Sequence, residues 1–259
     1  MDLQLAGRSV LVTGASKGIG LSIAQWFARE GCILHLVARS NDLLLRLAQQ
    51  LRDANGVTVH TYAADLSSDA GRTALMRACP EVDILINNAG DIPAGSIDSI
   101  DDASWRAGWD LKVFGYISLT RHYLARMKGH GKGVIINVIG TAGERPLASY
   151  VAGSMGNASL MSFTVALGVE SPAHGVRVLG VNPGPTLTER VMKICRKRAA
   201  DKFGDPERYA EMMQDFPFGR PASCDEVAAS VVFLASDLCA YTSGTVLTID
   251  GGFSRRGAV

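Results

Sequence analysis

The chain of 259 residues has no excess of charge of either sign and no long apolar run. Lys and Arg total 26 against 25 Asp and Glu, so no overall field would attract nucleic acid or an anionic membrane surface. No segment approaches the uninterrupted apolar length that a bilayer requires, and residues 1–8 lack the pattern of an export signal. We therefore expect no nucleic-acid partner and no membrane contact, and a small molecule as the partner.

Metal-ligand and disulfide patterns are also missing. The five cysteines are scattered without the spacing of a metal site, and their odd number argues against a closed disulfide framework. The five histidines have no spacing with Ser, Asp or Cys that indicates a triad or a metal centre. These absences predict a reduced, cytoplasmic protein without a metal site.

What the chain does have is an alternation of short apolar runs and longer segments of helical period, with 47% hydrophobic residues. This alternation is typical of βαβ units around a parallel sheet that is buried on both faces. The sequence predicts the α/β class, as a single-domain Rossmann fold over residues 1–259 with a doubly wound, seven-stranded parallel sheet. Strands are expected at residues 9–13, 33–38, 57–63, 84–87, 134–139, 176–181 and 246–250, and helices at roughly 18–30, 41–53, 69–78, 101–127, 153–170 and 223–236.

Residues 186–219 break this rhythm. They contain a basic cluster at 193–198, followed by proline, glycine and methionine residues. The length of the segment predicts a lid or substrate loop. An ordinary solvated surface helix explains the basic cluster equally well.

A glycine-rich turn follows the first expected strand. Gly14, Gly18 and Gly20 stand between that strand and a helix of apolar period. Glycines at this spacing allow a tight turn and a close approach of the backbone to a pyrophosphate, whose charge the amide groups and the helix dipole stabilise. An ordinary βα turn is the alternative, but three glycines in this context favour a nucleotide.

The segment 13–20 resembles the TGxxxGIG signature of the short-chain dehydrogenase/reductase family. Three further motifs follow in the family's order, at 87–90 (NNAG), 182–184 (NPG) and 250–252 (DGG). The resemblance spans nearly the full chain and implies an oxidoreductase that binds NAD(P). It implies phosphate contact by Ser16, an adenine edge at Asp65, and a nicotinamide end near Thr188; Asp65 alone could equally be a helix cap. The cofactor-binding residues implied in this way are Gly14, Ser16, Gly18, Ile19, Gly20, Asp65, Leu66, Asn88, Ala89, Gly90, Pro183, Gly184 and Thr188.

The end of the second expected strand indicates which form of the cofactor binds. An acidic residue there would accept hydrogen bonds from a ribose 2′-hydroxyl and would repel a 2′-phosphate. This chain has Arg39, whose planar donor fork suits a phosphate, and Lys17 can supply a second positive charge. We therefore expect NADP(H) rather than NAD(H). In the alternative, Arg39 only stacks on adenine and Lys17 points to water.

In the family, a Tyr and a Lys four residues later lie on one helix face, with a Ser on the preceding loop and an Asn on the long fourth helix. The nicotinamide carries the hydride. The pKa of the tyrosine hydroxyl is ordinarily about 10, and the nearby ammonium of the lysine lowers it toward neutral pH. This chain departs from that pattern. The neighbouring motifs place Gly140 at the Ser position, Gly153 at the Tyr position, Asn157 at the Lys position and Lys112 at the Asn position. All four usual catalytic residues are therefore expected to be replaced.

One tyrosine stands close to the vacated positions. Tyr150 lies one helical turn before Gly153, and the glycines at 140 and 153 would leave space beside the nicotinamide. Our hypothesis is that Tyr150 enters this space and that Lys112 replaces the missing ammonium or itself acts as the acid. In the alternative, Tyr150 is a surface residue at a helix entrance and Lys112 is a solvated or structurally paired lysine.

Three functions fit these residues. The first is an NADP(H)-dependent oxidoreductase acting on a carbonyl or alcohol with a non-standard acid/base apparatus. The second is a cofactor-binding protein with little turnover, serving as a sensor or a subunit, and the third is a non-redox elimination or isomerisation enzyme. The resemblance also implies a homo-oligomer, a dimer or tetramer, built through the helices at 101–127 and 153–170 and the C-terminal segment.

Overall fold

The computed structural model describes residues 2–256. Seven parallel strands form one sheet in the order β3-β2-β1-β4-β5-β6-β7. The strand order reverses between β1 and β4, so the crossovers on either side of this point cover opposite faces. The predicted single-domain Rossmann-like fold is confirmed. The strands are β1 (Ser9–Thr13), β2 (Ile33–Ala38), β3 (Val59–Ala63), β4 (Ile84–Asn87), β5 (Gly133–Val138), β6 (Val176–Pro183) and β7 (Val246–Ile249).

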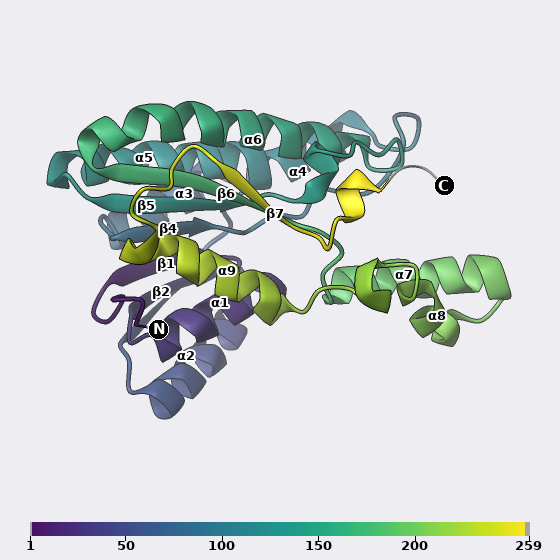
Figure 1. The fold of residues 1–259 in the computed structure, drawn as a ribbon, viewed down its shortest axis with the longest axis horizontal. Helices are drawn as coiled ribbons and strands as arrows, with labels where there is room; N and C mark the ends of the chain where they lie inside the picture. The colour runs from purple at the N-terminus through teal and green to yellow at the C-terminus, as the bar shows by residue number, and fades with distance from the viewer. Residues whose placement is uncertain (1, 257–259) are drawn as a thin grey trace.

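Helices cover both faces of the sheet (Figure 1). One face carries α1, α2 and α9, and the other carries α3, α5 and α6, with α4 leading into α5. Among the described residues the helices are α1 (Gly18–Arg29), α2 (Asn41–Asn55), α3 (Asp69–Ala78), α4 (Asp102–Trp109), α5 (Gly115–His130), α6 (Val151–Glu170), α7 (Glu189–Phe203), α8 (Tyr209–Met213) and α9 (Cys224–Ala235).

Successive residues of a strand belong to opposite layers. On β1, Val10 and Val12 join the core beneath α1 and α9, whereas Leu11 joins the core beneath α3 and α5. All three side chains are fully buried. Burial on both faces is the reason that residues 10–12 of β1 form an unbroken apolar run.

The expected helix at 101–127 is interrupted. It consists of α4, a π-helical turn at Asp110–Phe114, and α5, which runs to His130. A π turn accommodates an extra residue by widening the helix, and such turns are frequent at functional sites. Lys112 lies in the middle of this turn and is buried. Other departures are small: β3 begins two residues later than expected, and β6 runs two residues further because Asn182 and Pro183 still pair with β7.

The segment at 186–219 is largely helical rather than an open loop. It contains α7 and α8, which have a small core of their own made by Cys195, Ala199, Met212 and Phe216. Figure 1 shows this arm to one side of the sheet layers. The basic cluster at 193–198 lies on α7. This position agrees with the alternative that the cluster belongs to a surface helix.

A polar cluster interrupts the core between β2 and α3. The His35 ring stacks on His60 with centroids 4.9 Å apart, and its Nδ1 lies 3.0 Å from the Tyr62 hydroxyl and 3.3 Å from Cys79 Sγ. Burial, with the charge of His60 as the second cause, lowers the pKa of His35 from 6.5 to about 4. His35 is therefore neutral in the folded protein at pH values where an unfolded chain would protonate it.

This cluster predicts a loss of stability in mild acid. Between pH 6.5 and 4 the unfolded chain binds the proton that folded His35 excludes, so the free energy of unfolding falls as the pH falls. Allowing for partial exposure of the ring, we expect about 1–2 kcal/mol from this group. Urea unfolding of His35→Gln across this range should show a shallower dependence of the free energy of unfolding on pH than the wild-type protein. Equal slopes in wild type and His35→Gln would contradict the assignment.

Candidate functional site

The expected site residues gather at the carboxyl ends of the strands, around the point where the strand order reverses. Ligands of open α/β sheets bind in the crevice at this position. The glycine turn follows β1, the segment 88–90 follows β4, Gly140 follows β5 shortly after its end, and Gly184 follows β6. The fold therefore brings together motifs that are far apart in the sequence.

The glycine turn has the shape of a phosphate cradle. Gly14 and Gly18 have φ values of +67° and +58°, which favour glycine. A Cβ on Gly20 would lie 2.3 Å from the Gly14 carbonyl oxygen, so the turn closes only without a side chain there. The Lys17 side chain does not cap α1, whereas Ser68, Thr188 and Ser223 cap α3, α7 and α9. The first amides of α1 are thus left for an anion, and the cradle fits a dinucleotide. Ser16 and Ile19 of the same turn are half-buried.

The segment after β4 is locked against the glycine turn. The Thr13 hydroxyl accepts hydrogen bonds from the amides of Asn88 (2.8 Å) and Ala89 (3.0 Å), and Asn88 Nδ2 donates to the Thr13 carbonyl at 2.9 Å. Gly90 follows, with the aliphatic part of Lys112 packed where its Cβ would be. Glycine at 90 therefore makes room for the Lys112 chain.

The adenine end predicted from the sequence lies at the tips of β2 and β3. Arg39 and Asp65 are both exposed, while Leu66 is buried. Hydrogen bonds from Ser67 lower the pKa of Asp65, and the charge of Arg39 contributes, so the two side chains are neighbours. Asp65 thus forms a local turn with Ser67 and does not cap α3, which is capped by Ser68.

Lys17 has a partner on the arm. Its Nζ lies 3.1 Å from Glu189 Oε2, and both side chains are exposed. The Thr188 methyl packs 3.4 Å from where a Cβ of Gly18 would be, and the Thr188 hydroxyl caps α7 by accepting from the Val191 amide. The first turn of α7 therefore lies across the glycine turn. Pro183 is buried, and Gly184 is needed because its Cβ would meet Asp250 at 2.5 Å.

Lys112 is buried rather than solvated. Its side chain passes Gly90, and its ammonium donates to the Ile139 carbonyl, directly after β5. Burial, with the charge of Arg190 as the second cause, lowers the pKa of Lys112 to about 7. Within residues 2–256, no ion pair includes this ammonium. Lys112 can therefore gain or lose a proton near neutral pH.

The Tyr150 ring covers Gly153. A Cβ on Gly153 would lie 1.9 Å from Tyr150 Cζ, so the phenol end fills the space where a side chain at position 153 would begin. Burial raises the pKa of Tyr116, with Tyr150 as the second cause, and the Tyr116 hydroxyl donates to the Val138 carbonyl at 3.0 Å. Tyr150 is half-buried, and the loop before it is fixed by a bond from the Leu147 amide to Ser154 Oγ. The Tyr150 phenol therefore occupies the space above Gly153.

Gly140 and Asn157 interact directly. Asn157 Nδ2 donates to the Gly140 carbonyl at 3.2 Å, and the Gly140 amide donates to Asn182 Oδ1 at 3.2 Å. Asn182 Nδ2 in turn donates to Glu144 at 2.8 Å. Gly140 has a φ of +129°, which requires glycine. This network holds the strand-end loop against β6.

The chain matches the short chain dehydrogenase family over residues 8–199. The chain belongs to the short-chain dehydrogenase family. It is similar to L-sorbose reductase from Gluconobacter frateurii, whose structure holds NADPH and L-sorbose, with a TM-score of 0.90 and 32% identity over 99% of this chain and 100% of that one. It is 33% identical to galactitol 2-dehydrogenase (L-tagatose-forming) of Cereibacter sphaeroides, covering 97% of this chain and 96% of the relative. It is also 33% identical to cis-4-hydroxycyclohexanecarboxylate dehydrogenase of Sinomonas cyclohexanicum, covering 98% and 99%.

Sequence reasoning missed Arg190 in this short-chain dehydrogenase. Its guanidinium carbon lies 5.1 Å from the centroid of the Tyr150 ring, and its Nη2 donates to the Ile92 carbonyl at 2.9 Å. Arg190 stands on the first turn of α7, two residues after Thr188. Its position two residues after Thr188 indicates that it lies near the expected nicotinamide end. The basic cluster at 193–198 lies further along α7.

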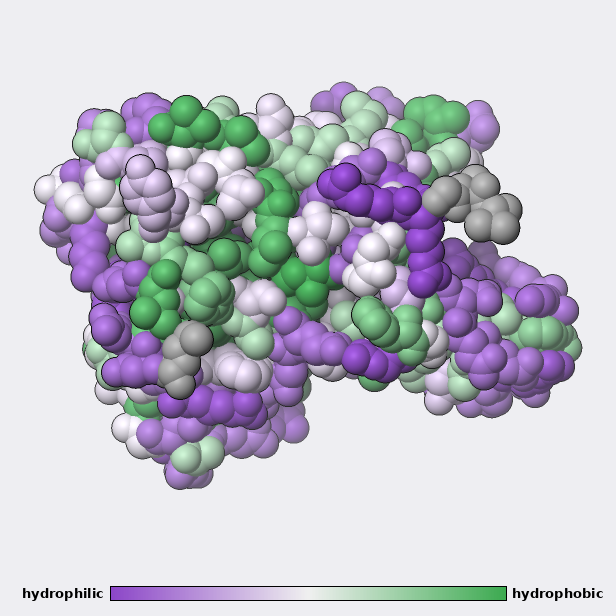
Figure 2. Space-filling model, in the orientation of Figure 1, coloured by the Kyte–Doolittle hydropathy of each residue, from purple (hydrophilic) through white to green (hydrophobic). Residues whose placement is uncertain are grey.

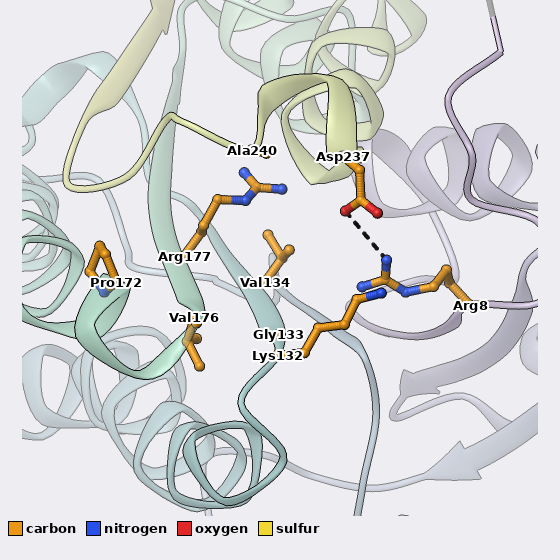
Figure 3. A pocket seen from close by; sticks show the side chains of 10 residues that line it. Arg8, Lys132, Gly133, Val134, Pro172, Val176, Arg177, Asp237 and Ala240 are labelled. Carbon is orange, nitrogen blue, oxygen red and sulfur yellow. Dashed lines mark ion pairs between the residues drawn. The ribbon is translucent and has the colours of Figure 1, made fainter.

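A cavity of about 200 Å³ lies at the opposite edge of the sheet, by the amino ends of β5 and β6 (Figure 3). Arg8 and Asp237 face each other there at 3.5 Å. The Arg177 guanidinium donates to the Leu234, Ala235 and Ser236 carbonyls at the end of α9. These charges are engaged in holding α9, so the cavity is not part of the site.

Within residues 2–256, no helix is long and apolar enough to cross a membrane. In the same part of the chain, no group of three or more His, Cys, Asp or Glu residues is placed to hold a metal ion.

Proposed function

We propose that this short-chain dehydrogenase is an NADP(H)-dependent oxidoreductase of a carbonyl or alcohol substrate, in which Tyr150 and Lys112 replace the family's usual acid/base residues. One observation carries the proposal: the Tyr150 ring fills the space over Gly153. A glycine at this position serves no purpose in a helix interior, where it costs about 1 kcal/mol relative to alanine. The glycine at position 153 is explained if its space is needed for the Tyr150 side chain.

The bound cofactor would supply the hydride to the carbonyl carbon, or accept it from the alcohol. The chain then has to give a proton to the carbonyl oxygen in reduction, or remove one in oxidation. We assign this transfer to the Tyr150 hydroxyl. Lys112, whose pKa burial lowers to about 7, would hold positive charge beneath the site in neutral and acidic solution and lose it in alkaline solution.

The cofactor assignment rests on the charges around the glycine turn and β2. Arg39 is exposed at the end of β2, and Lys17 stands in the glycine turn. A 2′-phosphate would draw Lys17 away from Glu189, its partner across the cleft. Hydrogen bonds from an arginine to a phosphate are charge-assisted, so Arg39 favours NADP(H), which has a 2′-phosphate, over NAD(H), which has a 2′-hydroxyl.

Arg39→Gln is expected to weaken NADPH binding by roughly 10–100-fold, the value of one or two charge-assisted hydrogen bonds. NADH binding should change little, because NADH has no 2′-phosphate. Calorimetric titration of both reduced cofactors measures this, with Arg46→Gln on the exposed face of α2 as the matched control. Equal or tighter binding of NADH by the wild-type protein would overturn the NADP(H) assignment.

The segment at 186–219 is proposed as a substrate lid, because α7 lies across the glycine turn and places Arg190 on Tyr150. A second function, cofactor binding without turnover, is favoured by one observation: the Lys112 ammonium is already bonded to the Ile139 carbonyl, as a structural lysine would be. NADPH binding without oxidation by any carbonyl compound would support that second function.

We also propose a homo-oligomer. Figure 2 shows apolar side chains gathered on the face over α6, α9 and β7, whereas α7 and α8 are mostly hydrophilic. Exposed apolar residues on this face include Val165 and Val169 on α6, Phe233 on α9 and Leu247 on β7. Light scattering after size-exclusion chromatography tests this, and a monomer at micromolar concentration would contradict it.

A further inference from the structure

The substrate end of the site carries positive charge without a matching acid. We propose that the substrate of this enzyme bears a carboxylate near the reacting carbonyl, and that Arg190 binds this carboxylate. The inference rests on the proposed reductase function and adds the class of substrate, a 2- or 3-oxo acid or the corresponding hydroxy acid.

Arg190 is held in place but is not neutralised. Stacking on the Tyr150 ring and the hydrogen bond to the Ile92 carbonyl fix the plane of its guanidinium. One of its terminal nitrogens is used in that bond. Within residues 2–256, Arg190 takes part in no ion pair. The remaining N–H groups form a fixed fork, the geometry that arginine uses for carboxylates.

Two acids of this part of the chain are bonded to other residues. Glu189, the preceding residue, is bonded to Lys17. Glu144 accepts hydrogen bonds from Asn182 and from the Thr248 hydroxyl, on the β6 and β7 side of the site. Neither carboxylate is paired with Arg190 in this structure.

Lys112 adds a second charge of the same sign. Arg190 is close enough to Lys112 for its charge to contribute to the low pKa of that buried ammonium. An arginine without an ion-pair partner over the phenol favours an anion beside it, since the anion lowers the electrostatic energy of the guanidinium. The negative groups of a dinucleotide bind at the start of α1, so this charge is left for the substrate.

The reaction on such a substrate is balanced without a further reagent. Bound NADPH would supply a hydride to the carbonyl carbon and be oxidised to NADP⁺, while the π electron pair would move to the carbonyl oxygen and that oxygen would take the Tyr150 proton. The carboxylate keeps its charge throughout and serves to place the carbonyl against the phenol. Binding through a group that does not react is a common source of positioning in enzymes.

The test compares oxo acids with their neutral methyl esters. The panel holds 2-oxo and 3-oxo acids of increasing length, each assayed with its ester by oxidation of NADPH. We expect the acid of the best pair to exceed its ester by roughly 10–100-fold in kcat/KM, the value of a charge-assisted hydrogen-bonded pair. Arg190→Met should bring the acid-to-ester ratio of kcat/KM close to 1, mostly through a higher KM for the acid.

Two controls identify other roles for Arg190. Arg196→Met removes a second stacked arginine from the same helix, over Tyr209, and should leave the preference intact. If Arg190→Met lowers turnover of acid and ester equally, Arg190 positions Tyr150 and the carboxylate assignment is wrong. If it instead weakens NADPH binding, Arg190 serves the cofactor and the assignment is also wrong.

The test remains decisive if no compound is turned over. That outcome would sink the proposed reductase function, but the acids can still be titrated calorimetrically into the protein saturated with NADP⁺. Binding of an oxo acid that is at least tenfold tighter than that of its ester, and is lost in Arg190→Met, would support the carboxylate site. Equal binding of acid and ester would overturn it.

Discussion

Replacing Tyr150 by phenylalanine is expected to lower kcat by about 10²–10⁴-fold, the range for loss of a general acid or base. The ring would still cover Gly153 and stack beneath Arg190, because neither contact uses the hydroxyl. NADPH affinity and the thermal midpoint should therefore stay at wild-type values. Single-turnover oxidation of NADPH measures the chemical step directly.

The matched control is Tyr241→Phe, since Tyr241 is fully exposed and lies away from the site. A wild-type kcat in Tyr150→Phe would show that another group transfers the proton. Gly153→Ala provides an independent check, because its methyl group would collide with the ring while leaving the phenol chemically intact. It should lose activity to a similar degree and gain up to about 1 kcal/mol of helix propensity.

Replacing Lys112 by methionine is expected to stabilise the fold while reducing activity. Folded Lys112 has a pKa of about 7, against 10.5 in an unfolded chain. Between these pH values the unfolded chain binds one more proton, so the stability of the wild-type protein rises with pH from about 7 to 10.5. Removing a buried, unpaired ammonium should therefore raise the free energy of unfolding by roughly 1–4 kcal/mol at pH 7, less the cost of the Ile139 carbonyl left without its donor.

Urea unfolding at several pH values tests this, with Lys197→Met on the exposed face of α7 as control. The gain should be largest at pH 7 and below, and should shrink as the pH approaches 10. In the wild-type enzyme, kcat for reduction should decline above a pH near 7, and Lys112→Met should lack this step. Unchanged stability at pH 7 would mean that Lys112 is already neutral or well solvated there.

The strands were predictable because burial on both faces favours apolar runs such as residues 84–86. The π turn at Lys112 was not, because the apolar residues on either side of it keep a helical period and a single extra residue hardly disturbs that pattern. The helices of the arm were not among the expected helices, although a surface helix was an alternative for the basic cluster at 193–198. The reason is that α7 is rich in charge and buries only Cys195 and Ala199, too few residues to mark a face.

The site itself was predictable in part. Local glycine and asparagine motifs identified the cofactor cradle, since turn geometry depends on neighbouring residues. The hypothesis that a phenol enters the space at Gly153 agrees with the position of the Tyr150 ring, although its catalytic role stays a prediction. Arg190 and the Glu144–Asn182 bond depend on how the arm and the strand-end loop pack, and no local pattern reports such packing.

The arm formed by α7 and α8 has a consequence for how this enzyme can change. Its small core shares no residue with the two cores that lie against the sheet. Substitutions in well-separated cores have effects on folding that usually add. Selection for new substrates can thus act on the arm while selection for heat resistance acts on the sheet, and the two sets of mutations can be found in separate libraries and combined afterwards.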